Sequence, residues 1–271
     1  MTVTTALMLA IYAIVNGNDA GWTSLPTLGL LAAAAGLFVV FLAIESRVKV
    51  PLMPLALFRL RNLATANLVG VLWAAAMFAW FFLSALYLQL VLGYTPWQVG
   101  LAFVPTNVIM AVCSLGISAR LVMRFGIKPP LAAGLLCAAA GLLLFARAPV
   151  DGTFAVDVLP PMLLLGFGAG IAFNPVLMAA MNDVAPSESG LASGIVNTSF
   201  MMGGALGLAI LASIAGARTQ TVALRGAEHA FALTAGYQLA FFGGAVFALL
   251  ATIAGLALLR TRPEAPALPS H

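Results

Sequence analysis

Charge is the scarcest feature of this sequence. Only 7% of its 271 residues are Asp, Glu, Lys or Arg, whereas 63% are hydrophobic. Soluble domains carry about 25% charged and roughly 45–50% apolar residues. A water-soluble globule of this length could not cover its surface with so few charges, so the composition predicts a protein whose solvent is lipid. No basic run is interleaved with aromatic residues, and we therefore expect no nucleic-acid partner.

Histidine and cysteine are nearly absent as well. Cys113 and Cys137 lie within apolar runs, where we interpret them as small buried hydrophobic residues. His229 and His271 are expected in a loop and in the C-terminal tail. The sequence contains no HExxH motif, no paired aspartates in an apolar run and no Ser–His pair at depth. We therefore expect no catalytic residues, no metal site, no cofactor and no enzymatic activity.

Long apolar runs make up most of what is present. A membrane-spanning helix needs about 20 mainly apolar residues. Open strands cannot cross lipid, and the runs lack the alternating pattern of a barrel strand. The sequence therefore predicts an all-α, polytopic membrane helix bundle of about eight transmembrane helices, the first of them short. The predicted runs are residues 1–15, 26–44, 63–91, 98–119, 129–147, 156–182, 191–215 and 237–259.

The breaks between these runs predict how the chain is organised. Turn-forming residues 16–19 separate the first two runs. A later apolar segment with basic ends is too short to span a membrane and is typical of an interfacial linker. We expect two helices in 1–45, a cytoplasmic interfacial linker in 46–62, six helices in 63–260, and a disordered, Pro-rich cytoplasmic tail in 261–271.

Lys and Arg are unevenly divided between alternate loops. Cytoplasmic loops of membrane proteins carry an excess of these residues. We therefore expect a multi-pass protein of the cell (plasma or inner) membrane with both termini in the cytoplasm. In that orientation the inner loops and tail contain Arg47, Lys49, Arg59, Arg61, Arg120, Arg124, Lys128, Arg260 and Arg262, and the outer loops contain Arg147, Arg218 and Arg225.

No ionisable residue lies deep within any predicted run. Such groups are costly in lipid and usually functional, so their absence predicts that the chain does not couple to protons alone. The amides of Asn107 and Asn174 do lie at depth and fit a substrate site near the midplane. Asn197, nearer a helix end, and Trp80, in an aromatic segment rich in Met, are further substrate-binding candidates. The alternative is that the amides hydrogen-bond between helices.

Glycine recurs at four-residue spacing in two successive runs. Gly166 and Gly170 form one pair, and Gly203 and Gly207 form another. Small residues at this spacing let helix backbones approach closely. Pro175 predicts a bend that frees backbone carbonyls. These five residues are our candidates for close packing and conformational change.

Four segments together resemble the C-terminal part of the major facilitator superfamily, in its fourteen-helix drug:proton antiporter branch. They are PLMPLALFR at 51–59 with Arg61-Asn62 after it, LGYTPWQVGLAFVP at 92–105, APSESGLASGIVNT at 185–198, and GGALG at 203–207. The resemblance covers nearly the whole chain. The loop at 116–128 also resembles the family's basic loop motif through Arg124, Gly126 and Lys128, although Met123 stands where an acid is often found.

The resemblance implies export of drugs or other small lipophilic molecules in exchange for protons, by alternating access between two six-helix halves. It implies that residues 1–45 are the extra helix pair and that 63–260 is the C-terminal domain. The family's N-terminal six-helix half, which carries its membrane-embedded acid, is absent from this sequence. The expected partners are therefore the lipid bilayer, a small-molecule substrate, and such a half in the same longer chain or a separate one. The alternative is a non-transporting orphan half-transporter or an inactive fragment.

Overall fold

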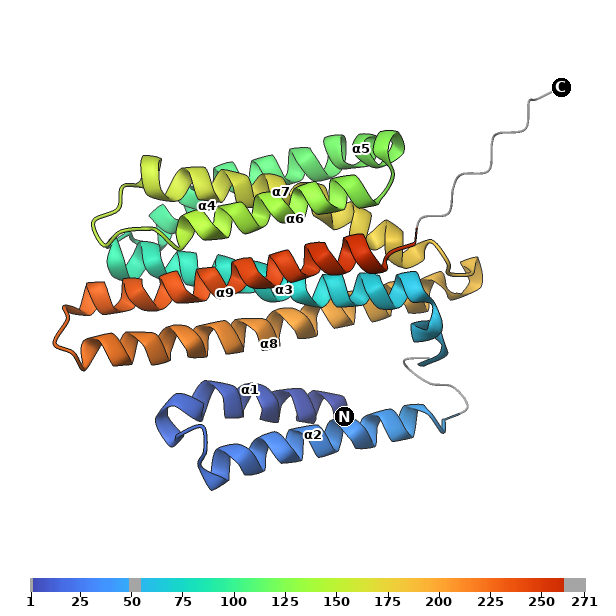
Figure 1. The fold of residues 1–271 in the computed structure, drawn as a ribbon, viewed down its shortest axis with the longest axis horizontal. Coiled ribbons are helices and arrows are strands. Elements are labelled where there is room, and N and C mark those ends of the chain that lie inside the picture. The colour runs from blue at the N-terminus through green and yellow to red at the C-terminus, as the bar shows by residue number, and fades with distance from the viewer. Residues whose placement is uncertain (1, 49–54, 261–271) are drawn as a thin grey trace.

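The computed structural model describes residues 2–48 and 55–260, and this part of the chain is an all-helical bundle (Figure 1). Within it, 7 helices are long and apolar enough to cross a membrane, and a shorter apolar helix precedes them. The prediction of an all-α bundle with about eight spans, the first of them short, is therefore confirmed. The predicted linker at 46–62 lies partly outside the described residues, and the predicted tail at 261–271 lies wholly outside them.

The helices fall into a pair and a larger unit (Figure 1). The pair is α1 (Thr2–Ala20) and α2 (Leu25–Glu45). A short 3-10 helix, η1 (Leu55–Arg59), then leads into the six-helix unit. That unit contains α3 (Arg61–Leu86), η2 (Tyr87–Val91), α4 (Pro96–Val112), η3 (Cys113–Ile117), α5 (Ser118–Phe125), α6 (Lys128–Phe145), η4 (Phe154–Val158), α7 (Leu159–Met181), η5 (Pro186–Glu188), α8 (Ser189–Ala223) and α9 (His229–Leu258).

Helix α3 lies at the centre of the six-helix unit. It packs along α8, α9 and α7, whereas α6 packs against α7 and α9, and α4 against α7. The α1–α2 pair lies outside this unit and contacts it through α1 against α8 (Figure 1). The largest fully buried side chains include Trp73, Trp80 and Tyr87 in the α3–η2 stretch, Phe145 in α6 and Phe241 in α9.

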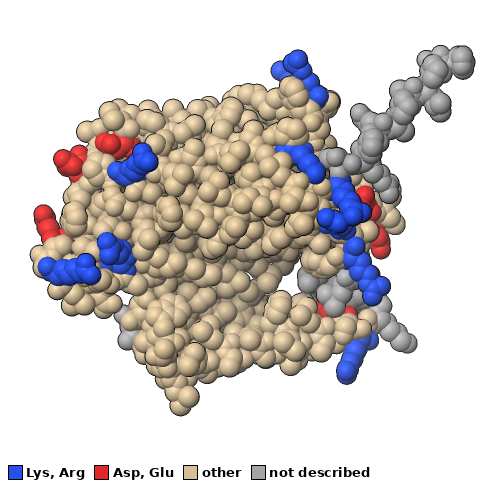
Figure 2. Space-filling model, viewed as in Figure 1, with Lys and Arg blue, Asp and Glu red and all other residues tan. Residues whose placement is uncertain are grey.

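Charged side chains gather at the two ends of the helices and leave the middle of the visible face largely free of charge (Figure 2). This arrangement is expected of helices that cross a bilayer, because charge is costly in the hydrocarbon core. The first turn of α1 and the last turn of α9 point toward the same end of the bundle (Figure 1). By the bounds of the helices labelled in Figure 1, that end carries Arg47, Arg59, Arg61, Arg120, Arg124, Lys128 and Arg260, and the opposite end carries Arg147, Arg218 and Arg225.

Helices α8 and α9 extend beyond the apolar runs that predicted them. The predicted break at 216–236 shrinks to residues 224–228, and His229 begins α9 instead of lying in a loop. Polar residues can continue α8 because their side chains can hydrogen-bond to the helix backbone. The hydroxyl of Thr221, for example, donates to Ala217 O at 2.8 Å. Apolarity therefore predicts the length of the membrane span, which is shorter than the helix.

The first turn also lies later than predicted. Residues 16–19 are helical, and the chain turns at Gly21, whose φ of 86° lies in the region that favours glycine. Asn18 continues the helix because its side chain is engaged elsewhere. Its Nδ2 donates to Ser213 O of α8 at 2.7 Å, and its Oδ1 accepts from Trp22 Nε1 at 2.9 Å.

Glycines set the closest helix contacts of the six-helix unit. A Cβ built on Gly207 of α8 would overlap Ala75 of α3, and one on Gly203 would lie 2.7 Å from Val71 Cα. Helix α7 meets two partners in the same way. A Cβ on Gly168 would lie 2.5 Å from Gly134 O of α6. Those on Gly166 and Gly170 would lie 2.6 Å from Thr106 O and Met110 O of α4.

Candidate functional site

Two adjacent cavities lie on the surface formed by α3, α4–η3, α7 and α8. Their volumes are about 250 and 380 Å³. Trp73 of α3 and Phe173 of α7 line both, so the two cavities adjoin. We refer to them as the paired cavities. The smaller is also lined by Ser193, Asn197, Phe200 and Met201 of α8, and the larger by Met77, Met110, Ser114 and Leu115.

The lining of the paired cavities is aromatic and polarizable. The ring of Phe200 lies edge-on to that of Phe173, with centroids 6.1 Å apart. The indole N–H of Trp73 is buried and has no hydrogen-bond partner among the described residues. Within residues 2–48 and 55–260, no Asp, Glu, His, Lys or Arg lines either cavity. Such a surface suits flat or irregular lipophilic molecules, because Met and aromatic side chains adapt to different shapes.

The predicted binding residues lie in different surroundings. Asn197 is exposed and lines the smaller of the paired cavities. Asn107 is exposed on the outer face of α4 and lines neither. Trp80 is fully buried, at 0% exposure, with its ring centroid 4.2 Å from that of Phe81. The structure therefore brings Asn197 together with Trp73 and Phe173, and it does not bring Asn107 or Trp80 into that group.

Asn174 joins two helices. Its Nδ2 donates to Ser114 O at 2.6 Å. Ser114 lies in η3, a π-helical turn in which the N–H of Ser118 bonds to Cys113 O instead of Ser114 O. The turn thus leaves Ser114 O available, and Asn174 reaches it from α7. This is the interhelical bond that the sequence left open as the alternative role of Asn174.

Pro175 creates a second such contact one residue further on. It has no N–H, so it cannot bond to Ile171 O as a helical residue would. The hydroxyl of Ser118 donates to Ile171 O at 2.9 Å instead. Pro175 of α7 and the π-turn η3 therefore compensate each other through two side chains, Ser118 and Asn174. Ser114 and Phe173 line the larger of the paired cavities, so the Asn174–Ser114 bond joins the two helices that form this part of its wall.

Phe173 and Ser118 could not have been singled out from the sequence. Phe173 is one of many Phe residues in apolar runs, and nothing in its neighbours marks it as lining a cavity. Ser118 gains its role from the π-turn, which the sequence does not signal. The sequence shows that Trp73 belongs to an aromatic segment, but it does not show that the Trp73 side chain lines the paired cavities.

The basic loop motif lies at the end of the bundle where α9 ends (Figure 1). Gly126 ends α5 with a φ of 78°, a conformation that favours glycine. The guanidinium of Arg124 lies over the Phe125 ring, 5.2 Å from its centroid. Lys128 Nζ donates to Leu256 O in the last turn of α9 at 3.1 Å. The helix dipole also stabilises a cation at this C-terminal end.

Long apolar helices with charged ends around cavities of lipophilic character define a multi-pass α-helical membrane protein. Comparison with protein families narrows this class. Residues 1–208 match the family model described as Major Facilitator Superfamily. The chain belongs to this superfamily, whose members are transporters and not enzymes.

The chain is also similar to several drug-resistance exporters, relatives of the fourteen-helix type. It is 32% identical to the puromycin resistance protein pur8 of Streptomyces alboniger over 265 residues, which are 96% of this chain and 52% of the relative. It is 32% identical to the cephamycin export protein CmcT of Amycolatopsis lactamdurans over 248 residues, which are 91% of this chain and 49% of the relative. The chain spans about half the length of these curated relatives.

Proposed function

We propose that this chain forms part of an exporter of drugs or other small lipophilic molecules. The paired cavities support the proposal, because they are apolar, aromatic and free of charge among the described residues. Trp73, Phe173 and Asn197 are the proposed substrate contacts. Asn107 and Trp80 remain candidates at a distance, and Asn174 acts on the site through its bond to Ser114 O. The similarity to puromycin, cephamycin and multidrug resistance proteins agrees with this substrate class.

We further propose that export is coupled to protons by a group that this chain does not contribute. A proton-driven transporter needs a titratable group that both sides of the membrane reach in turn. The described lining of the paired cavities contains none. A six-helix half, in a longer chain or a separate one, would supply it. Residues 63–260 would then be the C-terminal domain and 1–45 the extra helix pair, with both termini in the cytoplasm, where the more basic end belongs.

The test is an export assay in drug-susceptible bacteria. The 271 residues replace the matching part of the puromycin resistance protein in a chimera, and resistance and efflux are measured with puromycin and ethidium. We expect the chimera to export at least one compound. Phe173→Ala should lower efflux about threefold to tenfold, the effect of losing one aromatic contact. Asn197→Leu should change which compound is preferred.

Phe242→Ala is the matched control. Phe242 of α9 is 52% exposed and Phe173 is 47% exposed, but Phe242 lines neither of the paired cavities. Its loss should leave efflux unchanged at equal expression. If both variants reduced efflux equally, the paired cavities would not be the substrate site. If no chimera exported any compound despite normal expression, the chain would be a non-transporting half or an inactive fragment.

A further inference from the structure

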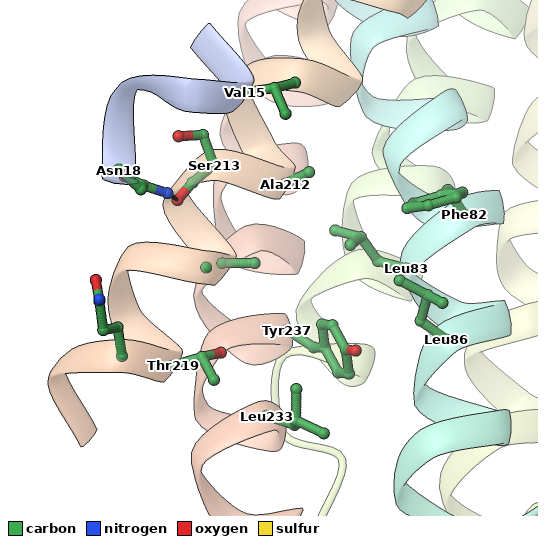
Figure 3. Close-up of a pocket in the computed structure, with 13 residues that line it drawn as sticks. Val15, Asn18, Phe82, Leu83, Leu86, Ala212, Ser213, Thr219, Leu233 and Tyr237 are labelled. Atoms are coloured by element: carbon green, nitrogen blue, oxygen red, sulfur yellow. Dashed lines mark hydrogen bonds between the residues drawn. The ribbon is translucent and has the colours of Figure 1, made fainter. Parts of the chain in front are cut away.

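A third cavity, of about 510 Å³, lies between α1 and the six-helix unit (Figure 3). We refer to it as the lateral cavity. Its apolar wall consists of Phe82, Leu83 and Leu86 of α3, Leu233 of α9 and Val15 of α1. It shares no residue with the paired cavities. On α8 it uses residues 212–220, whereas the smaller of the paired cavities uses residues 193–201 of the same helix.

Four hydrogen-bonding side chains line the lateral cavity without engaging one another. Ser213, at 6% exposure, has a buried hydroxyl with no partner among the described residues. The side chains of Thr219, Gln220 and Tyr237 also make no hydrogen bond to another residue of the described chain. In Figure 3, Thr219 and Tyr237 extend from neighbouring helices into the space beside Leu83 and Leu86.

Among the described residues, Ser213 and Thr106 have buried hydroxyls without a hydrogen-bond partner, and of these two only Ser213 lines this cavity. Hydroxyls in apolar helices normally bond back to the carbonyl four residues earlier. Thr221, Thr234 and Thr252 do so here, at 2.8 to 2.9 Å. Ser213 and Thr219 have the same option and do not take it. A buried hydroxyl left unpaired in an apolar setting costs free energy, so Ser213 favours a ligand that bonds to it, and Thr219 and Tyr237 line the same cavity.

The chemistry of that ligand follows from the lining. No charged side chain among the described residues lines the cavity, and an unpaired charge in apolar surroundings would be costly. The volume lies in the range of small-molecule sites, which are mostly apolar with a few polar groups. We propose that the lateral cavity binds a small uncharged amphiphile, with an apolar body and a hydroxyl or carbonyl group. The α1–α2 pair then completes a binding site, because α1 forms one wall and Asn18 anchors it to α8.

Photolabelling tests this proposal on the 271-residue chain in phosphatidylcholine nanodiscs. The probe is a diazirine analogue of decan-1-ol, and labelled peptides are mapped by mass spectrometry. We expect labelling in segments 82–86, 212–220 and 233–237. Unlabelled decan-1-ol should compete with the probe. Decane at the same membrane concentration should compete about fivefold less well, the effect of losing one hydrogen bond.

Two α8 variants form a matched pair. Ala212 lines the cavity, so Ala212→Phe should fill it and abolish labelling. Ile214, two residues on, is 39% exposed and does not line it, so Ile214→Phe should label as the parent does. Tyr237→Phe keeps the ring and removes the hydroxyl, so it should weaken decan-1-ol competition about threefold to tenfold. Size-exclusion profiles and thermal midpoints establish that each variant is folded.

Two outcomes would overturn the proposal. If decane competed as well as decan-1-ol, the cavity would be an apolar gap filled by phospholipid chains. If Ala212→Phe were folded and labelled as the parent is, the probe would bind elsewhere. Neither result bears on export through the paired cavities, because the assay measures binding at the opposite half of α8 and requires no transport.

Discussion

The six-helix unit and the α1–α2 pair are built from similarly apolar helices but are held by different contacts. Of the most apolar stretch of α2, 17% is buried, compared with 56% for the α3–η2 stretch and 61% for η4–α7; within the six-helix unit only the outer α4–η3–α5 stretch is as little buried, at 17%. Yet α2 has the highest hydropathy of the long helices. Gly207 of α8 lies directly against Ala75, whereas Gly29 and Gly36 of α2 have nothing within 4 Å.

This difference shows that apolarity does not assemble helices in lipid. Lipid tails are as apolar as Leu, so helix association depends on close packing and hydrogen bonds. The six-helix unit has both, in glycine contacts and in the bonds of Asn174 and Ser118. The pair is joined to it by α1, with the Asn18–Ser213 bond at the rim of the lateral cavity.

Gly207→Leu should have the largest effect. The new side chain would overlap Ala75 and separate α3 from α8. We expect the free energy of unfolding to fall by about 3 kcal/mol, at the upper end for an overpacked core. Unfolding by SDS in mixed micelles measures it. Gly36→Leu on α2 is the control, and a comparable loss there would remove the contrast between the two regions.

Asn62→Ala should have the next largest effect. Asn62 of α3 clasps the end of α9: its Nδ2 donates to Arg260 O at 2.9 Å, and its Oδ1 accepts from Arg260 N at 2.8 Å. Loss of both bonds should cost about 2 kcal/mol by the same SDS assay. Thr65→Ala, which removes a bond within α3 alone, should cost less. If Asn62→Ala and Thr65→Ala lowered the free energy of unfolding equally, the bonds of Asn62 to Arg260 would not help to hold α3 and α9 together.

Ser118→Ala should have a moderate effect. It removes the hydroxyl that bonds to Ile171 O, four residues before Pro175, and should cost about 0.6–1 kcal/mol, as for polar contacts in other membrane bundles. A double-mutant cycle with Asn174→Leu measures whether the two bonds act together. Additive losses would contradict the mutual compensation inferred here. Ser84→Ala, whose hydroxyl bonds within α3, controls for loss of a buried hydroxyl.

Asn18→Leu should have the smallest effect on global stability. It removes the bond from α1 to Ser213 O without touching the six-helix unit. We expect hydrogen exchange in α1 to rise about threefold, as for one weak interhelical bond, while the SDS unfolding midpoint stays unchanged. Asn16→Leu is the control, because its amide bonds to Tyr12 O within α1. Equal exchange in both variants would mean that Asn18 does not anchor the pair.

Much of the candidate site could not be predicted from the sequence. The positions of Asn107 and Asn174 within their apolar runs predicted how deep in the membrane they lie. Depth does not tell which face of a helix a residue occupies. Asn107 lies on the exposed face of α4, and Asn174 donates to Ser114 O in the π-turn η3, which the sequence does not signal. Phe173 lines both paired cavities although nothing around it in the sequence marks it.

The sequence by itself determined that this is a multi-pass helical membrane protein with polar helix ends. Because charge is scarce, the surface of the protein must face lipid. Because the apolar runs are long enough to span a bilayer, they must form helices, which pair all their backbone groups internally. Only the tertiary structure decided which glycines meet a neighbour, where α8 and α9 end, and which polar groups remain unpaired around the lateral cavity. The reason is physical: transfer into lipid depends on composition summed along a segment, whereas packing depends on which side of each helix faces the next.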